Sequence, residues 1–502
     1  MLTLLLPESG GFRRFRPSLF LALGACFLVC GCGRSDSQKK GAASDSATGP
    51  LKDRIAKLVQ PLIDGGWSKG LMVGIVQRGK QSFYSFGSLG DEVEGEIGED
   101  TIFEIGSITK VFTALVLADM VAKGEVALED SVAKYLPGDW QIPTPGDRPI
   151  TLGSLADHTS GLPTIPANFW KQGDKIYNSD IGGLRWRDYS EQHFSEYFDD
   201  PTPLPDPQRK YIYSNLGSGV LGYALARKAG CSLDELIRER ICEPLGMQKT
   251  SFVLESTGPG HNPDGNVAAP WTAGDSVLRG AFALRSTTAD MLKFAEIALD
   301  ATGSPTERAL TLSMKPRASI NDLEKTALGW KVNKFGVVYT AGATGGFRCA
   351  LFLHPKSQTA VLALANSQVG GVTGGRATLF DALVGSLLNV TLGAPPLKAE
   401  FPMPLDSGSD SLTEYIGNYR PVTGSTGPSF PVSVRLSHGQ LTAQGPGDIE
   451  IVLWKLAKDV YFTRSYLGEM RFRRDDSGKV SGMDLSFDGR ISKLRREPAA
   501  EK

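Results

Sequence analysis

The stretch that decides the fold prediction for this chain is FEIGSITK, at residues 103–110, which runs directly into the apolar segment VFTALVL, at residues 111–117. Ser107 and Lys110 stand three positions apart, so on a helix their side chains lie on one face and the amine can reach the hydroxyl. A lysine whose pKa is lowered by burial can accept the serine proton and make the hydroxyl nucleophilic. The apolar segment predicts a buried helix over residues 107–123 with this pair at its N-terminus, where free amides stabilise a developing oxyanion.

The Ser-x-x-Lys pattern is short, and residues 37–40 and 131–134 match it as well, both in polar surroundings. A capping serine beside a solvated lysine is therefore the alternative interpretation of the pair. Two later segments favour the catalytic interpretation. Residues 213–215, Tyr-Ser-Asn, offer a phenol for proton transfer and an amide for a substrate carbonyl. Residues 340–347, TAGATGGF, predict a strand that ends in small residues, which allows a substrate to approach the backbone closely.

Together and in this order, the three segments resemble those of the serine penicillin-recognising hydrolases, in the branch of class C β-lactamases, D-Ala-D-Ala carboxypeptidases and related esterases. The resemblance covers roughly residues 51–390. Four further stretches support it, namely DHTSGLP at 157–163, EPLGM at 243–247, LRST at 284–287 and GGF at 345–347. It implies an α+β fold: an antiparallel sheet flanked by helices, a helical lobe beside the sheet, and the site at the seam between them.

The resemblance also implies a role for each matching residue. Ser107 would be the nucleophile that forms the acyl-enzyme, while Lys110 and Tyr213 would share the general-base and general-acid steps. The backbone amides of Ser107 and Ala343 would form the oxyanion hole, and Asn215 would orient the substrate amide. The predicted substrate-binding residues are Asn215, Thr340, Gly342, Ala343 and Arg348. No cofactor and no metal ion is expected, because the five histidines are scattered and no Cys-x-x-Cys pair is present.

The third segment departs from the family at its first position. The family has Lys or His there, whereas this chain has Thr340. A cation at this position would bind the substrate carboxylate and favour the deprotonated forms of Tyr213 and Lys110. Threonine offers only a neutral hydrogen bond, of about half the strength of a charge-assisted one. Arg348 is a candidate to replace the charge, and the neutral Thr340 otherwise favours substrates without a free carboxylate, such as esters or internal cross-links.

The N-terminal residues predict export from the cytoplasm. A basic cluster at residues 13–16 precedes an apolar run at 19–29, which is too short to span a bilayer and is typical of a signal peptide. The sequence VCGC at 29–32 resembles a bacterial lipobox, which implies cleavage and lipidation at Cys32. An ordinary signal peptide is the alternative. The polar residues 33–50 are predicted to form a tether, and the absence of Asp after the cysteine points to the outer membrane. We expect a periplasmic lipoprotein of the bacterial cell envelope.

The apolar pattern of the remaining chain predicts two folded regions. The first region begins and ends with a helix and strands, which indicates one sheet to which both ends of the region contribute. Its predicted elements are helices at 51–63, 216–228, 288–299 and 377–388, a hairpin at 71–86, and strands at 337–340, 347–353 and 359–364. In the second, six short alternating runs indicate a small antiparallel β-barrel of lipocalin type. The predicted divisions are a lipoprotein signal peptide at 1–32, a tether at 33–50, a catalytic domain at 51–393, a linker at 394–411 and a barrel at 412–502.

Composition excludes several other classes of protein. The 502 residues include 54 Lys and Arg against 55 Asp and Glu, so the net charge of −1 gives no electrostatic argument for nucleic acid. With 41% hydrophobic residues, the chain is neither a disordered tail nor a coiled coil. The stretch GWSKG at 66–70 matches the nucleophile elbow of α/β-hydrolases, but a helix precedes it and a strand follows, which reverses the required order. It is interpreted as a turn.

Two alternatives to a peptidase or β-lactamase-like hydrolase stay open. One is a non-catalytic binder of the same fold that senses or scaffolds the cell wall, and Thr340 favours it. The other is a carboxylesterase of the same fold. The expected substrate is a small molecule or a peptidoglycan peptide, with the lipid anchor as the contact to the membrane. The oligomeric state is left open.

Overall fold

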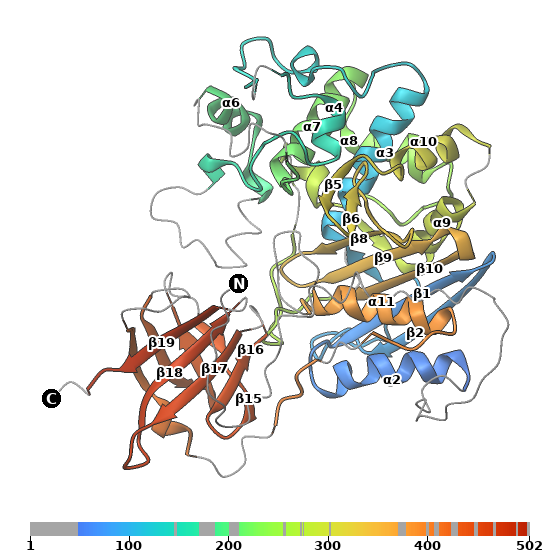
Figure 1. The fold of residues 1–502 in the computed structure, drawn as a ribbon. Coiled ribbons are helices and arrows are strands. Elements are labelled where there is room, and N and C mark those ends of the chain that lie inside the picture. The colour runs from blue at the N-terminus through green and yellow to red at the C-terminus, as the bar shows by residue number, and fades with distance from the viewer. Residues whose placement is uncertain are drawn as a thin grey trace, which may run out of the picture.

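The computed structural model describes residues 49–144, 148–169, 186–199, 210–254, 258–271, 274, 276–300, 303–369, 378–397, 401–405, 411–422, 430–445, 450–464, 468–487 and 490–498. The predicted signal peptide, Cys32 and all but the last two residues of the predicted tether lie outside them. Over the described part of the chain, no helix has both the length and the apolarity that a membrane span requires. Figure 1 shows a central sheet with helices on both sides, a helical lobe above it and a second β-structure towards the C-terminus.

An eight-stranded antiparallel sheet forms the centre of the first region, in the order β2-β1-β10-β9-β8-β7-β6-β5. Strands β1 and β10 are far apart in the chain, yet they pair with Leu71 opposite Ala365. The prediction of one sheet closed by both ends of this region is therefore confirmed. The strands are β1 (Gly70–Gln77), β2 (Lys80–Gly87), β5 (Ala318–Asn321), β6 (Glu324–Thr326), β7 (Lys331–Asn333), β8 (Val338–Ala343), β9 (Arg348–His354) and β10 (Thr359–Ala365), and a separate pair is formed by β3 (Ile102–Glu104) and β4 (Arg285–Thr287).

Helices cover both faces of this sheet because its central strands are apolar on both sides. On β10, Leu362 and Leu364 belong to the core under the helical lobe, whereas Val361 and Ala363 belong to the core under α2 and α11. This alternation follows from the two-residue period of a strand. The helices are α2 (Leu51–Asp64), α3 (Thr109–Ala122), α4 (Leu152–Ala156), α6 (Glu191–Asp199), α7 (Asn215–Ala229), α8 (Leu233–Ile237), α9 (Thr288–Leu299), α10 (Pro305–Ser313) and α11 (Leu379–Thr391).

Helix α3 carries the decisive stretch into the helical lobe and is buried along most of its length. The predicted single helix is divided in the structure: a 3-10 turn, η2, spans Gly106–Ile108, and α3 follows it directly. The Thr109 hydroxyl donates to the Gly106 carbonyl at 2.6 Å and accepts from the Leu284 amide at 3.0 Å. These bonds account for the tight first turn, because a hydroxyl that binds nearby backbone groups competes with α-helical pairing.

A second antiparallel sheet, of nine strands, follows in the order β14-β13-β12-β11-β19-β18-β17-β16-β15. Its outer strands β14 and β15 are separated only by Leu453, so one bent strand pairs first with β13 and then with β16. The sheet thereby curls into a nearly closed barrel, as predicted. Its strands are β11 (Gly417–Pro421), β12 (Val432–Ser437), β13 (Gln440–Gln444), β14 (Glu450–Val452), β15 (Trp454–Ala457), β16 (Val460–Thr463), β17 (Gly468–Arg474), β18 (Val480–Phe487) and β19 (Arg490–Arg496).

Side chains fill the interior of this barrel. Tyr415, Tyr419, Tyr461 and Phe472 are buried there, and the ring of Phe472 lies against each of the three tyrosines. A small barrel filled in this way is a packed core rather than a ligand cavity. Strands β13 and β19 are missing from the six predicted runs because few of their residues are apolar, and β15 is missing because it has only four residues and follows β14 after one residue.

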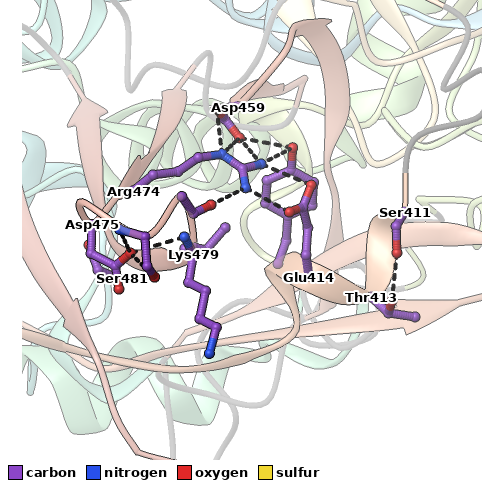
Figure 2. Close-up of polar contacts among 12 residues, drawn as sticks. Ser411, Thr413, Glu414, Asp459, Arg474, Asp475, Lys479 and Ser481 are labelled. Atoms are coloured by element: carbon purple, nitrogen blue, oxygen red, sulfur yellow. Dashed lines mark hydrogen bonds and ion pairs between the residues drawn. The ribbon is translucent and has the colours of Figure 1, made fainter.

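An ion network fixes the start of the barrel, as Figure 2 shows. Arg474 on β17 donates to Glu414 at 2.7 and 2.9 Å and to Asp459 at 2.7 Å. Glu414 lies in the 3-10 turn η9 (Leu412–Tyr415), and Asp459 lies between β15 and β16. The Tyr415 hydroxyl donates to Asp459 at 2.9 Å. The network therefore joins three separate parts of the barrel around one guanidinium.

The barrel contacts the first region at the turn between α2 and β1. Arg464, just after β16, lies over the rings of Trp67 at 4.9 Å and Trp454 at 3.6 Å from their centroids. Its guanidinium donates to the carbonyl of Gly65 at 2.6 Å and also to that of Gly66. Burial lowers the pKa of Arg464 to about 10. The GWSKG stretch is thus a turn, as interpreted from the sequence, and it serves as the contact surface for the barrel.

Removing the Arg464 side chain is expected to weaken this contact. The Arg464→Ala variant should lose about 2–4 kcal/mol of unfolding free energy, because two carbonyls lose their donor and two indole rings lose a cation. Arg471→Ala is the matched control, since its side chain is 44% exposed and pairs with Glu469 at the surface; it should cost under about 1 kcal/mol. Urea denaturation of both variants tests this, and equal losses would contradict the inferred contact.

Candidate active site

Three predicted side chains meet at one oxygen atom. Lys110 Nζ donates to Ser107 Oγ at 3.0 Å, and the Tyr213 hydroxyl donates to the same oxygen at 2.6 Å. Lys110 also donates to the carbonyl of Ala281 at 2.6 Å, and its ammonium lies 4.8 Å from the centroid of the Tyr213 ring. The other two Ser-x-x-Lys matches differ: residues 37–40 lie outside the described part, and in the second the lysine pairs with Asp130 instead.

Burial separates the proton affinities of the two groups that flank Ser107. Lys110 is 3% exposed, and loss of solvation holds its pKa well below 10.5. Burial raises the pKa of Tyr213 to about 12, although its bond to Ser107 and the charge of Arg348 act in the opposite direction. Near neutral pH the phenol therefore keeps its proton while the amine is the group that burial drives towards its neutral form. This arrangement suits Lys110 as a proton acceptor and Tyr213 as a proton donor.

His158, a residue with no predicted role, holds Tyr213 in place. The backbone amide of Ser214 donates to His158 Nδ1 at 3.2 Å, and the imidazole lies 4.8 Å from the Tyr213 ring. Burial lowers the pKa of His158 to about 3, and the charges of Lys110 and Lys331 add to this effect. The ring is therefore neutral at physiological pH and free to accept this bond. Its place in the DHTSGLP stretch was the only sequence signal for it.

The residues after His158 complete the support for this segment. The Thr164 hydroxyl donates to the backbone carbonyl of Tyr213 at 2.8 Å, and the Thr164 carbonyl accepts from the backbone N–H of Asn215 at 3.0 Å. The Ser214 hydroxyl donates to the carbonyl of Pro163 at 2.6 Å and caps α7 by accepting from Gly217. Asn215 is the first residue of α7, two positions from Tyr213. Both predicted residues thus sit where a hydrogen-bonded loop enters helix α7.

The backbone of β8 touches the turn that carries Ser107. A Cβ atom on Gly342 would lie 2.1 Å from the Ile105 carbonyl oxygen and 2.9 Å from the Ser107 nitrogen. A Cβ atom on Gly106 would lie 2.7 Å from the Ala343 nitrogen. Only glycine fits at both positions, and the contact brings the amides of Ser107 and Ala343 together beside the nucleophile. Two amides placed in this way are the donors that an oxyanion hole requires.

One edge of β8 is open next to this site. Strand β9 pairs with β8 from Val338 to Ala343, whereas the described part of β7 pairs only with Val338 and Tyr339. Residues 340–343 therefore offer backbone groups to a substrate that lies along the strand. Thr340 is 7% exposed and brings a hydroxyl group, but no charge, to this position.

The contacts of Arg348 do not match the role predicted for it, which was to bind a substrate carboxylate. It is 6% exposed, donates to the Thr378 hydroxyl at 2.7 Å and lies 3.4 Å from the Asp381 carboxylate. Thr378 and Asp381 also form the capping box at the start of α11. A substrate carboxylate would have to compete with Asp381 for this guanidinium, so the geometry gives no support to Arg348 as the replacement cation. Its charge still acts on Tyr213.

The sequence of residues 55–386 matches the model of the Beta-lactamase family, and the chain belongs to this family. A β-lactamase of Pseudomonas fluorescens is 23% identical over 302 residues, which cover 59% of this chain and 78% of that protein. The D-alanyl-D-alanine-carboxypeptidase/endopeptidase AmpH of Escherichia coli K12 is 25% identical over 340 residues, covering 61% of this chain and 81% of that protein. The resemblance drawn from the sequence motifs is therefore confirmed.

Solved structures agree on the fold. The β-lactamase/D-alanine carboxypeptidase from Pseudomonas syringae superposes with a TM-score of 0.55 at 20% identity, covering 68% of this chain and 98% of that one. A class C β-lactamase gives a TM-score of 0.54 at 19% identity, with coverages of 63% and 91%. The predicted α+β fold, with its antiparallel sheet and helical lobe, is confirmed. Membership of a family of serine β-lactamases and carboxypeptidases supports a serine hydrolase.

Proposed function

We propose that this protein is a serine hydrolase that cleaves amide or ester bonds through an acyl-enzyme on Ser107. The observation that carries the proposal is the pair of bonds at Ser107 Oγ, from Lys110 at 3.0 Å and from Tyr213 at 2.6 Å. A desolvated amine within hydrogen-bond distance is what a serine hydroxyl needs to become a nucleophile. The names of the AmpH and Pseudomonas syringae relatives support a D,D-peptidase or β-lactamase-like activity over other hydrolases.

The proposed reaction passes a proton from Ser107 through Lys110 and Tyr213 to the leaving group. Neutral Lys110 accepts the proton of Ser107 Oγ as this oxygen attacks the substrate carbonyl carbon. The amides of Ser107 and Ala343 stabilise the negative charge on the carbonyl oxygen. Tyr213 donates its proton to the leaving nitrogen or oxygen and regains one from Lys110. A water molecule then attacks the acyl carbon with the same groups acting in reverse, which releases the acid and frees Ser107.

Two alternatives use the same site. A carboxylesterase would need the same groups and differs only in the substrate that it accepts. A non-catalytic binder is favoured by one observation, the neutral and buried Thr340 at the position where the family has a cation. We also propose that the protein is a periplasmic lipoprotein anchored through Cys32, most simply in the outer membrane, which would place the site near peptidoglycan peptides. The basic cluster, the apolar run and the VCGC stretch of the N-terminal sequence support this location.

Covalent labelling tests the proposed nucleophile. A fluorophosphonate probe should label the wild-type protein at one residue, and Ser107→Ala should abolish labelling. Ser131→Ala is the matched control, because Ser131 also begins a Ser-x-x-Lys pattern and should not affect labelling. Undiminished labelling of Ser107→Ala would overturn the proposal. Turnover of a D-Ala-D-Ala peptide, a cephalosporin and a short-chain ester then separates the enzyme from a binder, since a binder would be labelled but would release no product.

A further inference from the structure

The open edge of β8 leads from the oxyanion hole to a lysine on the neighbouring strand. Lys331 begins β7 and stands opposite Tyr339 in the register, at the point where β7 ceases to pair with β8. Paired residues on adjacent strands point to the same face, and Lys331 Nζ lies 5.9 Å from the centroid of the Tyr339 ring. A substrate that extends from Ala343 along the open edge towards Tyr339 therefore ends beside this ammonium.

The electrostatic neighbours of Lys331 lie on both sides of this edge. On the side of the nucleophile, its charge contributes to the lowered pKa of His158, whose ring contacts Tyr213. On the side of α11, Asp381 and Arg348 act on Lys331 itself. These interactions agree with an ammonium at the end of the open edge, which the register of β7 and the contact with the Tyr339 ring indicate.

We propose that Lys331 is a specificity-determining residue, whose ammonium binds a carboxylate on the part of the substrate that lies along the open edge of β8. It would supply from β7 the charge that Thr340 does not supply from β8. The inference rests on the proposed function. It reverses the expectation drawn from Thr340 alone, that substrates without a free carboxylate are preferred.

Two other cations near the site are held by groups of the protein. Arg348 is held by Asp381 and Thr378, and Lys110 is bound to Ser107 and Ala281. Burial lowers the pKa of Lys331, whereas the nearby charges of Glu324 and Asp381 act in the opposite direction. Glu324, however, also accepts the hydroxyl of Tyr339. These two carboxylates favour the charged form of the amine, which is the form that binds an anion.

Competition against fluorophosphonate labelling of Ser107 measures this recognition directly. The competitors are a peptide ending in D-Ala-D-Ala and the same peptide as its C-terminal amide. The wild-type protein should bind the acid about tenfold more tightly than the amide, because the contact is charge-assisted. Lys331→Met should bring this ratio close to one, and Lys331→Arg should restore most of it. Lys334→Met is the control, since Lys334 is exposed beyond the strand end and should leave the ratio unchanged.

A neutral p-nitrophenyl ester gives the second readout. In Lys331→Met, the affinity for the acid peptide should fall by a larger factor than kcat/KM for this ester does, since the ester complex has no carboxylate contact to lose. Equal binding of acid and amide by the wild type, or an unchanged ratio in Lys331→Met, would overturn the inference while the proposed function stands. Failure of the wild type to be labelled would overturn the proposed function instead. Titration calorimetry with the two peptides would then decide the role of Lys331 by itself.

Discussion

Lys110→Met is expected to lower kcat/KM for a neutral p-nitrophenyl ester by about a thousandfold to ten-thousandfold, the full contribution of a positioned general base. The substitution keeps an unbranched side chain in a buried site and removes only the amine. Its bonds to Ser107 Oγ and the Ala281 carbonyl are lost. Ser107 then has no group that can accept its proton. The rate of fluorophosphonate labelling should fall by a similar factor, because it depends on the same nucleophile.

The Lys110→Arg variant tests whether Lys110 acts as a general base or only through its positive charge. Arginine has donors for Ser107 and Ala281 but does not lose its proton in proteins, so it cannot act as a base. It should therefore be about as inactive as Lys110→Met. Thermal denaturation of both variants shows whether the fold is intact. If the arginine variant kept most of the activity, Lys110 would act through its charge, and the proposed mechanism would be wrong.

The pH profile of the wild type checks the same assignment. Because burial holds the pKa of Lys110 well below 10.5, kcat/KM for the neutral ester should rise about tenfold per pH unit below that lowered pKa and then level off. The unfolded chain keeps the Lys110 proton to higher pH than the folded chain does, so the contribution of Lys110 to stability also rises with pH in that interval. A profile that falls with pH over the same range would contradict this.

Gly342→Ala is expected to lower kcat about a hundredfold to a thousandfold, as the loss of an oxyanion-hole donor does. The added methyl would lie 2.1 Å from the Ile105 carbonyl oxygen and 2.8 Å from Cys349 Sγ, so the backbone must move. Any such movement separates the Ala343 amide from the Ser107 turn. The donor is then displaced from the position that the carbonyl oxygen occupies in the transition state.

Gly138→Ala is the control for this substitution, since its Cβ would meet no atom within 4 Å. It should keep full activity and thermal stability. Gly342→Ala should lose kcat more than it raises KM, because the oxyanion hole acts in the transition state rather than in binding. Wild-type kcat in Gly342→Ala would show that β8 does not carry the oxyanion hole.

The elements with strong apolar patterns could be predicted from the sequence. Strand β1, the strands of the sheet centre and helix α9 were predictable because their residues are buried on one or both faces. Strand β2 is only partly buried and was predictable from the turn that joins it to β1. Strands β5, β6 and β7 were not, since they have only three or four residues each and include few apolar side chains. Their position is determined by pairing to β8, which is information that the local sequence does not contain.

The same distinction applies to the site. Ser107, Lys110 and Tyr213 could be found from motifs, because each lies in a stretch whose composition is itself unusual. Lys331 had no such signal, since its relation to the site comes from the register between β7 and β8. Arg348 was predicted as a replacement cation, but its partner Asp381 comes from α11, which packs on β9 from another part of the chain. The sequence therefore indicated the positive charge of Arg348, but it gave no sign that Asp381 would pair with it.

The contact at Trp67 has a consequence for genetics. Phe462 belongs to the same core cluster as residues of α2, β1 and α11, so the barrel completes the interior of the region that carries Ser107. A screen for inactive mutants would therefore recover substitutions near Arg464 as well as at the nucleophile. The first class would reduce the amount of folded protein in the cell, whereas the second would leave its abundance unchanged. Immunoblots of the mutants would sort the two classes without any assay of turnover.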